Sequence, residues 1–177
     1  MRTIARFFDT IVGWISLAAA AIAAFLLLAM FVVVQYEVVM RYWFGRPTHW
    51  THEVTTFAIA WVGFLSAGYL LRQGRQLEID IVTSRLSAGA RRLLGTFTDI
   101  IGAAFCGYTV LLGYRFVSTA HMMGATNASE LDTPLWIPYS AIPIGFTILG
   151  LEFLARILNR WGLTPERSDD PHSSTAI

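Results

Sequence analysis

The chain alternates between long apolar runs and short polar segments. Four runs carry almost no charge, and each has about 17–20 residues or more, enough to cross the hydrocarbon core of a bilayer as a helix. Backbone groups in lipid must be hydrogen-bonded within the protein, and four segments are too few to close a β-barrel. We therefore predict four transmembrane helices, over about residues 11–40, 54–71, 93–115 and 135–158.

The first run follows two arginines near the N-terminus and resembles a signal peptide at first sight. The apolar region of a signal peptide is only about 7–15 residues long, whereas no charged residue occurs between Asp9 and Glu37. Trp14 and Tyr36 are 22 positions apart, about 33 Å along a helix, which places one aromatic ring at each membrane interface. The pattern therefore predicts a retained first helix.

Composition supports a membrane protein. The 177 residues are 55% hydrophobic and have a mean hydropathy of +0.54, which excludes an ordinary soluble domain. A net charge of +1 gives no general attraction to nucleic acid, and the single Cys106 rules out an internal disulfide. The expected fold is an all-α integral membrane protein with one four-helix domain over residues 1–163. The polar segment 164–177 is expected to be a disordered cytoplasmic tail.

The arginines predict the orientation. All 13 basic residues are arginine, and with the N-terminus inside, ten of them fall on the cytoplasmic side and three outside. The outer three are Arg41, Arg46 and Arg115. Because positive residues are enriched in cytoplasmic loops, both termini are predicted to be cytoplasmic. The basic loop 72–92 between the second and third spans fits either an interfacial helix or a solvated loop.

Small residues predict where helices pack closely. They form pairs at Gly63 and Ala67 and at Ala141 and Gly145, and a longer row on the third span, namely Gly95, Asp99, Ala103 and Gly107. Asp99 lies on that row, so it is predicted to face a helix contact. It is interpreted as a structural carboxylate bonded to a hydroxyl, with an ion-coupling role as the alternative. Pro138 and Pro143 predict a bent first half of the fourth span.

Charges also gather between the first and second spans. Glu37 and Arg41 are one helical turn apart and can pair, but we expect Arg41 to reach across the turn to Glu53 and join the two helices. One stripe of the second span holds Glu53, Phe57, Trp61, Phe64 and Gly68. The stripe is interpreted as an ordinary packing face in preference to a ligand site.

Several of these residues resemble a known family, the small permease subunit of TRAP transporters (the DctQ-like family). The resemblance spans about residues 10–160. It rests on segment 41–47, on Trp50-Thr51-His52-Glu53, on Trp61, Phe64 and Gly68, on segment 74–80, and on Pro134, Trp136, Pro138, Tyr139, Pro143, Gly145 and Phe146. Gln76 departs from the family pattern, which often has histidine there.

The resemblance implies a scaffold role in a three-part sodium-driven importer of organic acids in the bacterial inner membrane. Its partners would be a large permease, a periplasmic substrate-binding protein and membrane lipid. The chain would be no enzyme and hold no cofactor, because substrate and sodium would bind the large subunit. The residues expected at structural or partner contacts are Arg41, Trp50, Glu53, Trp61, Phe64, Asp80 and Asp99.

Two other classes of protein fit parts of the pattern. A haem-binding quinone-reductase anchor needs histidines that face each other within the membrane, whereas His49, His52 and His121 fall at helix ends. A small proton-coupled exporter needs an ionisable pathway through the membrane, for which Asp99 is the only good candidate.

Overall fold

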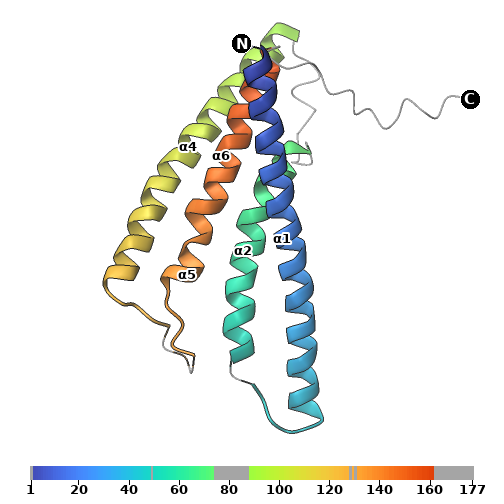
Figure 1. The fold of residues 1–177 in the computed structure, drawn as a ribbon, viewed down its shortest axis with the longest axis vertical. Helices are drawn as coiled ribbons and strands as arrows, with labels where there is room; N and C mark the ends of the chain where they lie inside the picture. The colour runs from blue at the N-terminus through green and yellow to red at the C-terminus, as the bar shows by residue number, and fades with distance from the viewer. Residues whose placement is uncertain (1, 49, 74–87, 128, 130, 162–177) are drawn as a thin grey trace, which may run out of the picture.

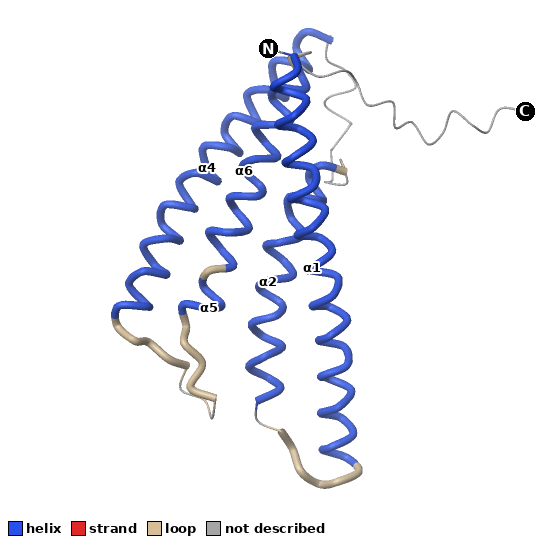
Figure 2. The backbone as a smooth tube through the Cα atoms, in the orientation of Figure 1, coloured by secondary structure: helices blue, strands red, loops and turns tan. Residues whose placement is uncertain are grey.

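The structure is a computed structural model that describes residues 2–48, 50–73, 88–127, 129 and 131–161. The chain there is helical almost throughout. The helices are α1 (Arg2–Tyr42), α2 (Trp50–Arg72), α4 (Ala88–Met122), α5 (Trp136–Tyr139) and α6 (Ala141–Arg160), joined by short loops (Figure 2). Segment 74–87, the tail beyond 161 and the predicted interfacial helix lie outside the described residues.

Four stretches are long and apolar enough to cross a membrane: Arg6–Tyr42, Trp50–Arg72, Leu93–Met122 and Trp136–Arg160. The predicted all-α, four-span fold is therefore confirmed. The helices extend further than predicted, most clearly in α1 and α4, because the prediction stopped at polar residues. Arginine is a good helix former, so a helix need not end where its sequence becomes charged.

The fourth span is interrupted near its start, in the half where its prolines predicted a bend. The short α5 ends at Tyr139, and α6 begins at Ala141, with Ser140 between them. Pro143 has no N–H to donate to a carbonyl one turn earlier, so regular helical bonding is interrupted here. The Ser140 hydroxyl donates to the carbonyl of Ile137 at 2.6 Å.

The helices form an open arrangement. α2 and α6 pack side by side at the centre, α1 lies against α2, and α4 lies against α6. Within the described residues α1 and α4 share no extended contact. The helices converge at the end that holds the N-terminus, here called the terminal end, and spread at the other, the turn end, which holds the α1–α2 turn and the α4–α5 loop (Figure 1).

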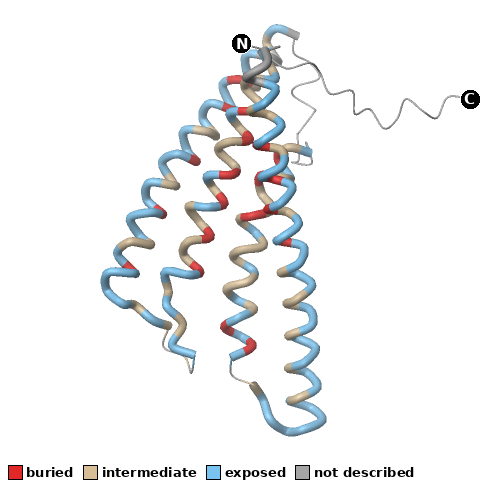
Figure 3. Tube along the Cα trace, viewed as in Figure 1, coloured by how far each residue is buried: buried red, intermediate tan, exposed pale blue. Residues whose placement is uncertain are grey.

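Small residues bring the central helices together. The buried cluster joins Ala19 and Ala23 of α1 to Leu65 of α2 and Ile148 of α6. Buried positions follow the faces between helices, while much of α1 and α4 is exposed (Figure 3). Large exposed apolar side chains suit a lipid environment, in which association depends on close packing and polar contacts.

The predicted small-residue rows are partly right. Ala141 is fully buried, and a Cβ at Gly145 would lie 2.5 Å from Phe64, so this pair marks a close contact. Gly63 and Gly107 have no neighbour within 4 Å of an added Cβ, so they make no close helix contact among the described residues. Twelve positions separate Gly95 from Gly107, which at 3.6 residues per turn is about 120° of rotation around the helix axis. Residues spaced four apart therefore drift around α4, and Gly107 no longer lies on the face that contacts α6.

Candidate functional site

The terminal end is held by an ionic cluster built around Arg72. This arginine, at the last position of α2, contacts Asp9 Oδ2 of α1 at 3.1 Å and Glu152 Oε2 of α6 at 3.2 Å. It also donates to the Asp9 carbonyl at 3.1 Å. One guanidinium thus joins three helices, and its fixed fork of donors suits such multiple contacts.

Neutral groups complete this Arg72 cluster. Ser16 donates a hydrogen bond to Glu152 Oε1, and Asn159 donates to Asp9 Oδ1 at 3.2 Å. A Cβ at Gly13 would lie 2.7 Å from Arg72 Nη2, so glycine leaves room for the guanidinium against α1. Glu152 is only 1% exposed, and a buried carboxylate of this kind persists where it is paired and hydrogen-bonded.

A second ion pair fixes α4 to α6 at the same end. Asp99, 3% exposed, lies with its Oδ2 3.1 Å from Arg160 Nη2. A Cβ at Gly95 would be 1.8 Å from Arg160 Nη1, so glycine is required for the arginine to lie across this turn of α4. Asp99 therefore faces a helix contact as predicted, but the partner seen here is a guanidinium, where a hydroxyl was expected.

At the turn end, the predicted pair between Arg41 and Glu53 is wrong. Arg41 Nη2 contacts Glu37 Oε1 at 2.6 Å, within one turn of α1. The other oxygen of Glu37 accepts from the backbone N–H of Thr48 at 3.0 Å and from the hydroxyl of Thr51 at 3.4 Å. Glu37, and not Arg41, therefore connects α1 to the start of α2.

Glu53 contacts a different part of the chain. Its Oε2 accepts a hydrogen bond from Ser129 in the α4–α5 loop, and the residue is 6% exposed. The side chains of Asn127 and Thr133 in the same loop also interact with the carboxylate. The carboxylate thus holds the loop between α4 and α5 against α2, a contact between segments 76 positions apart.

The remaining predicted site residues lie in ordinary packing positions. Trp50 packs on Tyr36 with ring centroids 6.2 Å apart. Trp61 packs against the buried cluster, and Phe64 covers Gly145 and meets Phe146 at 5.7 Å. Asp80 lies outside the described residues. The structure thus gives the second-span stripe a packing role within the chain, while its predicted contact with a partner stays a prediction.

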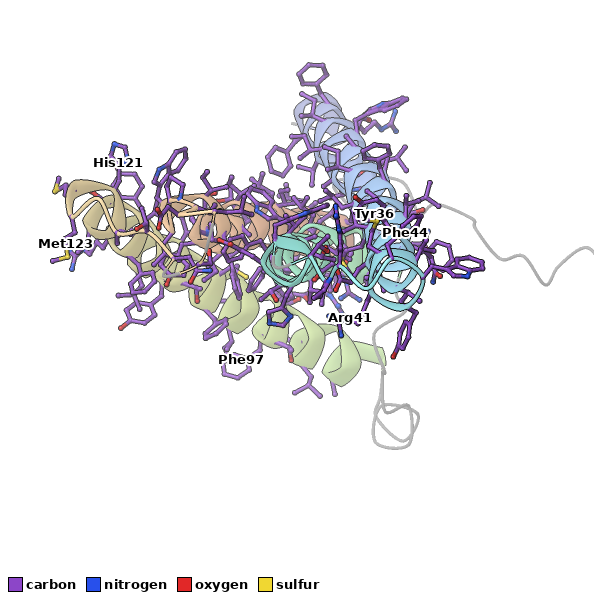
Figure 4. All side chains as sticks on the ribbon, turned by 90° about the horizontal axis from the view of Figure 1, so that it is seen from below. Tyr36, Arg41, Phe44, Phe97, His121 and Met123 are labelled. Carbon is purple, nitrogen blue, oxygen red and sulfur yellow. The ribbon has the colours of Figure 1, made fainter. Side chains whose placement is uncertain are left out.

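The two sides of the turn end lie well apart. Seen from below, Tyr36, Arg41 and Phe44 lie beside the α1–α2 turn, far from His121 and Met123 at the end of α4 (Figure 4). His121 meets Trp136 edge-on at 5.7 Å. In the described part of the chain, no three His, Cys, Asp or Glu residues are placed to hold a metal ion.

Sequence reasoning missed the Arg72 cluster and the partner of Asp99. A usable signal was present, because Asp9, Arg72 and Glu152 each fall near the same predicted membrane surface. Ionisable groups at that depth are expected to pair. Grouping the charged residues by their predicted depth in the membrane, instead of pairing those on neighbouring spans, would have suggested these contacts.

Comparison with known proteins places the chain among transporter components. A family profile described as "Tripartite ATP-independent periplasmic transporters, DctQ component" matches residues 30–163. The match begins within α1 and covers α2, α4, α5 and α6 in full.

Three curated relatives show the same similarity. The C4-dicarboxylate TRAP transporter small permease protein DctQ of Rhodobacter capsulatus is 34% identical over 106 residues, covering 59% of this chain and 46% of that protein. The ectoine TRAP transporter small permease protein TeaB of Halomonas elongata is 27% identical over 118 residues, 67% of this chain and 61% of the relative. The DctQ protein of Pseudomonas aeruginosa is 27% identical over 129 residues, with shares of 68% and 61%. The chain thus spans about half to three fifths of these relatives' lengths.

Proposed function

The chain belongs to the DctQ component family of tripartite ATP-independent periplasmic (TRAP) transporters, and from this membership we propose that it is a membrane scaffold for a large permease. It is a small permease subunit, a component of a transporter and not an enzyme. With four apolar helices, it is a multi-pass membrane protein. The specific role within the transporter is what we propose.

The observation that supports a scaffold is that the buried charged side chains pair with one another between helices. Arg72 joins α1, α2 and α6, and Arg160 joins α6 to α4. Buried ions that bind one another in this way fix the crossing of helices, whereas a transport pathway needs ionisable groups that face a water-filled route. The scaffold role therefore agrees with the charge placement better than a proton-coupled exporter does, since Asp99 is already paired.

The exposed apolar face of α1 leaves surface on which a large partner can pack. Phe25, Leu28 and Phe31 of α1 are 68%, 64% and 63% exposed. We propose that the large permease lies along α1 and α2, with Trp50 near the contact. A relative from Oleidesulfovibrio alaskensis, the isethionate TRAP transporter permease protein DctMQ, is matched over 72% of this chain but only 21% of its own length. That proportion fits a small component joined to a much larger one.

The transport reaction we propose is sodium-coupled import of an organic acid delivered by a periplasmic binding protein. Substrate and sodium would bind the large permease, with no cofactor on this chain. The named substrates of the relatives, C4-dicarboxylates, ectoine and isethionate, suggest small charged organic molecules. Both termini would be cytoplasmic, as the arginine distribution favours, and the complex would lie in the bacterial inner membrane.

Reconstitution in liposomes tests this function. The substrate is first identified by thermal-shift screening of the associated binding protein against organic acids, beginning with C4-dicarboxylates. Uptake of the radiolabelled acid is then measured with an inward sodium gradient. We expect uptake only when this chain, the large permease and the binding protein are all present.

Controls separate the parts of the proposal. Replacing the sodium gradient by a potassium gradient should abolish uptake if sodium is coupled. Substrate-dependent flux through this chain alone would disprove the scaffold role, and full uptake without this chain would show that no scaffold is needed. A reporter fused after Ile177 should be active in the cytoplasm, and a periplasmic signal would disprove the proposed topology.

A further inference from the structure

A groove beside Arg115 has the shape and charge of a phospholipid site. It lies between α4 and the start of α6 and has a volume of about 460 Å³. Thr109, Leu112, Gly113, Phe116 and Ile142 provide a mostly apolar lining, and Arg115 adds one positive charge. Gly113 is buried, and a Cβ there would be 3.1 Å from Pro143, so the glycine allows α6 to form the floor of the groove.

Arg115 differs from Arg41, Arg72 and Arg160. Arg41, Arg72 and Arg160 each contact a carboxylate, whereas no described carboxylate lies within ion-pair distance of the Arg115 guanidinium. The side chain is exposed. The guanidinium is therefore open to an anion from outside the described chain.

The depth of Arg115 fits a lipid headgroup. It follows Asp99 by 16 positions, a rise of about 24 Å, close to the hydrocarbon thickness of about 30 Å. Because Asp99 is at the terminal end, Arg115 falls near the opposite membrane surface. Tyr114 is 70% exposed, and Phe116 packs on Tyr139 with centroids 4.7 Å apart. Aromatic rings of this kind are enriched at the headgroup level.

We propose that this groove binds one phospholipid of the leaflet at the turn end. The lipid phosphate contacts the Arg115 guanidinium, which is suited to bidentate phosphate recognition, and one acyl chain lies along Leu112, Phe116 and Ile142. A phospholipid fits because its phosphate can contact Arg115 while its acyl chain lies along the apolar lining of the groove. A free phosphate would use only the charge, and an apolar helix would leave Arg115 unpaired.

Native mass spectrometry of the full-length chain in mild detergent tests the proposal. The probe is phosphatidylglycerol with palmitoyl and oleoyl chains, added at a series of concentrations. Arg115→Gln should bind the first lipid about tenfold more weakly than wild type, equivalent to about 1.4 kcal/mol, while Arg115→Lys should keep part of the affinity. Arg46→Gln is the matched control, since Arg46 is an exposed arginine in the α1–α2 turn that lies outside the groove, and it should bind like wild type.

A second variant tests the acyl chain. Leu112→Trp leaves Arg115 in place but fills the groove, and it should also weaken retention of the lipid. Circular dichroism melting confirms that each variant is folded. Equal binding by wild type and Arg115→Gln, or equal loss in Arg46→Gln, would overturn the proposal. Displacement of the lipid by inorganic phosphate together with wild-type retention by Leu112→Trp would show an anion site only, and would also overturn it.

Discussion

The terminal end and the turn end of the molecule use their charges in opposite ways. At the terminal end, Arg72 contacts carboxylates 63 and 80 positions away in the sequence, and the helices converge (Figure 1). At the turn end, the ion pair of Arg41 and Glu37 lies within a single helix, and the helices spread. Ion pairs between helices fix a crossing point, whereas a pair within one helix cannot.

This difference matters because lipid provides little hydrophobic drive for helices to associate. At the turn end, the α4–α5 loop is held to α2 by hydrogen bonds to Glu53, the first of them from Ser129. We therefore expect most of the stability of the helix arrangement to depend on the terminal end. Substitutions there should be more harmful than substitutions of equal size at the turn end.

The largest effect should come from Arg72→Leu. Removing the guanidinium leaves Asp9 and the almost fully buried Glu152 without compensation, which typically costs about 3–5 kcal/mol. The free energy of unfolding in mixed micelles, followed by circular dichroism during denaturant titration, provides the measurement. Arg46→Leu, which removes an exposed arginine at the turn end, is the control and should change little. Equal stability of Arg72→Leu and wild type would contradict the role of this cluster.

A smaller effect should follow from Gly95→Ala. The added methyl group would occupy the position of the Arg160 guanidinium, so the arginine must move and its pair with Asp99 weakens. We expect a loss of about 1–2 kcal/mol, within the usual range for single substitutions.

The same α4 helix provides a matched control for Gly95→Ala. Gly107 has no neighbour within 4 Å of an added Cβ. Because alanine is favoured over glycine in a helix by about 1 kcal/mol, Gly107→Ala should be neutral or slightly stabilising. If both substitutions lower the free energy of unfolding equally, the Arg160 contact is not the cause.

The smallest effects concern Arg41 at the turn end. In a double-mutant cycle, Arg41→Ala and Glu53→Ala should be additive because the two residues do not pair. Arg41→Ala and Glu37→Ala should show a coupling of about 0.3–0.5 kcal/mol, typical of an ion pair one turn apart in a helix. A clear coupling between Arg41 and Glu53, larger than that between Arg41 and Glu37, would mean that the turn is arranged differently.

The sequence was sufficient to predict the four spans but not the contacts between them. Hydropathy identifies four membrane helices because a run such as 11–40 has no other stable state in lipid. The proline-dependent break at Ser140 was also predictable, because proline removes a backbone donor at a known position. These features depend on local chemistry alone.

The contacts depend on helix rotation and on the path of loops. Gly63 and Gly107 belong to plausible rows but have no neighbour within 4 Å of an added Cβ, since the row alone does not fix which side a partner occupies. Glu53 was assigned to Arg41 because the two are close along the chain, yet Ser129 approaches from a distant loop. Only the folded arrangement shows which of several possible partners is near.

The central claim is that the helices of this chain form a fixed frame while the transporter works. Paired spin labels in the assembled transporter test it most directly, with buried Cys106 replaced by alanine. Exposed positions give one pair at the terminal end, Trp14 with Phe97, and one at the turn end, Tyr42 with Leu111. The distances measured by double electron–electron resonance should be the same with and without sodium and substrate, for both the terminal-end pair and the turn-end pair. A shift of several ångströms on adding substrate would contradict the fixed frame and indicate a moving part.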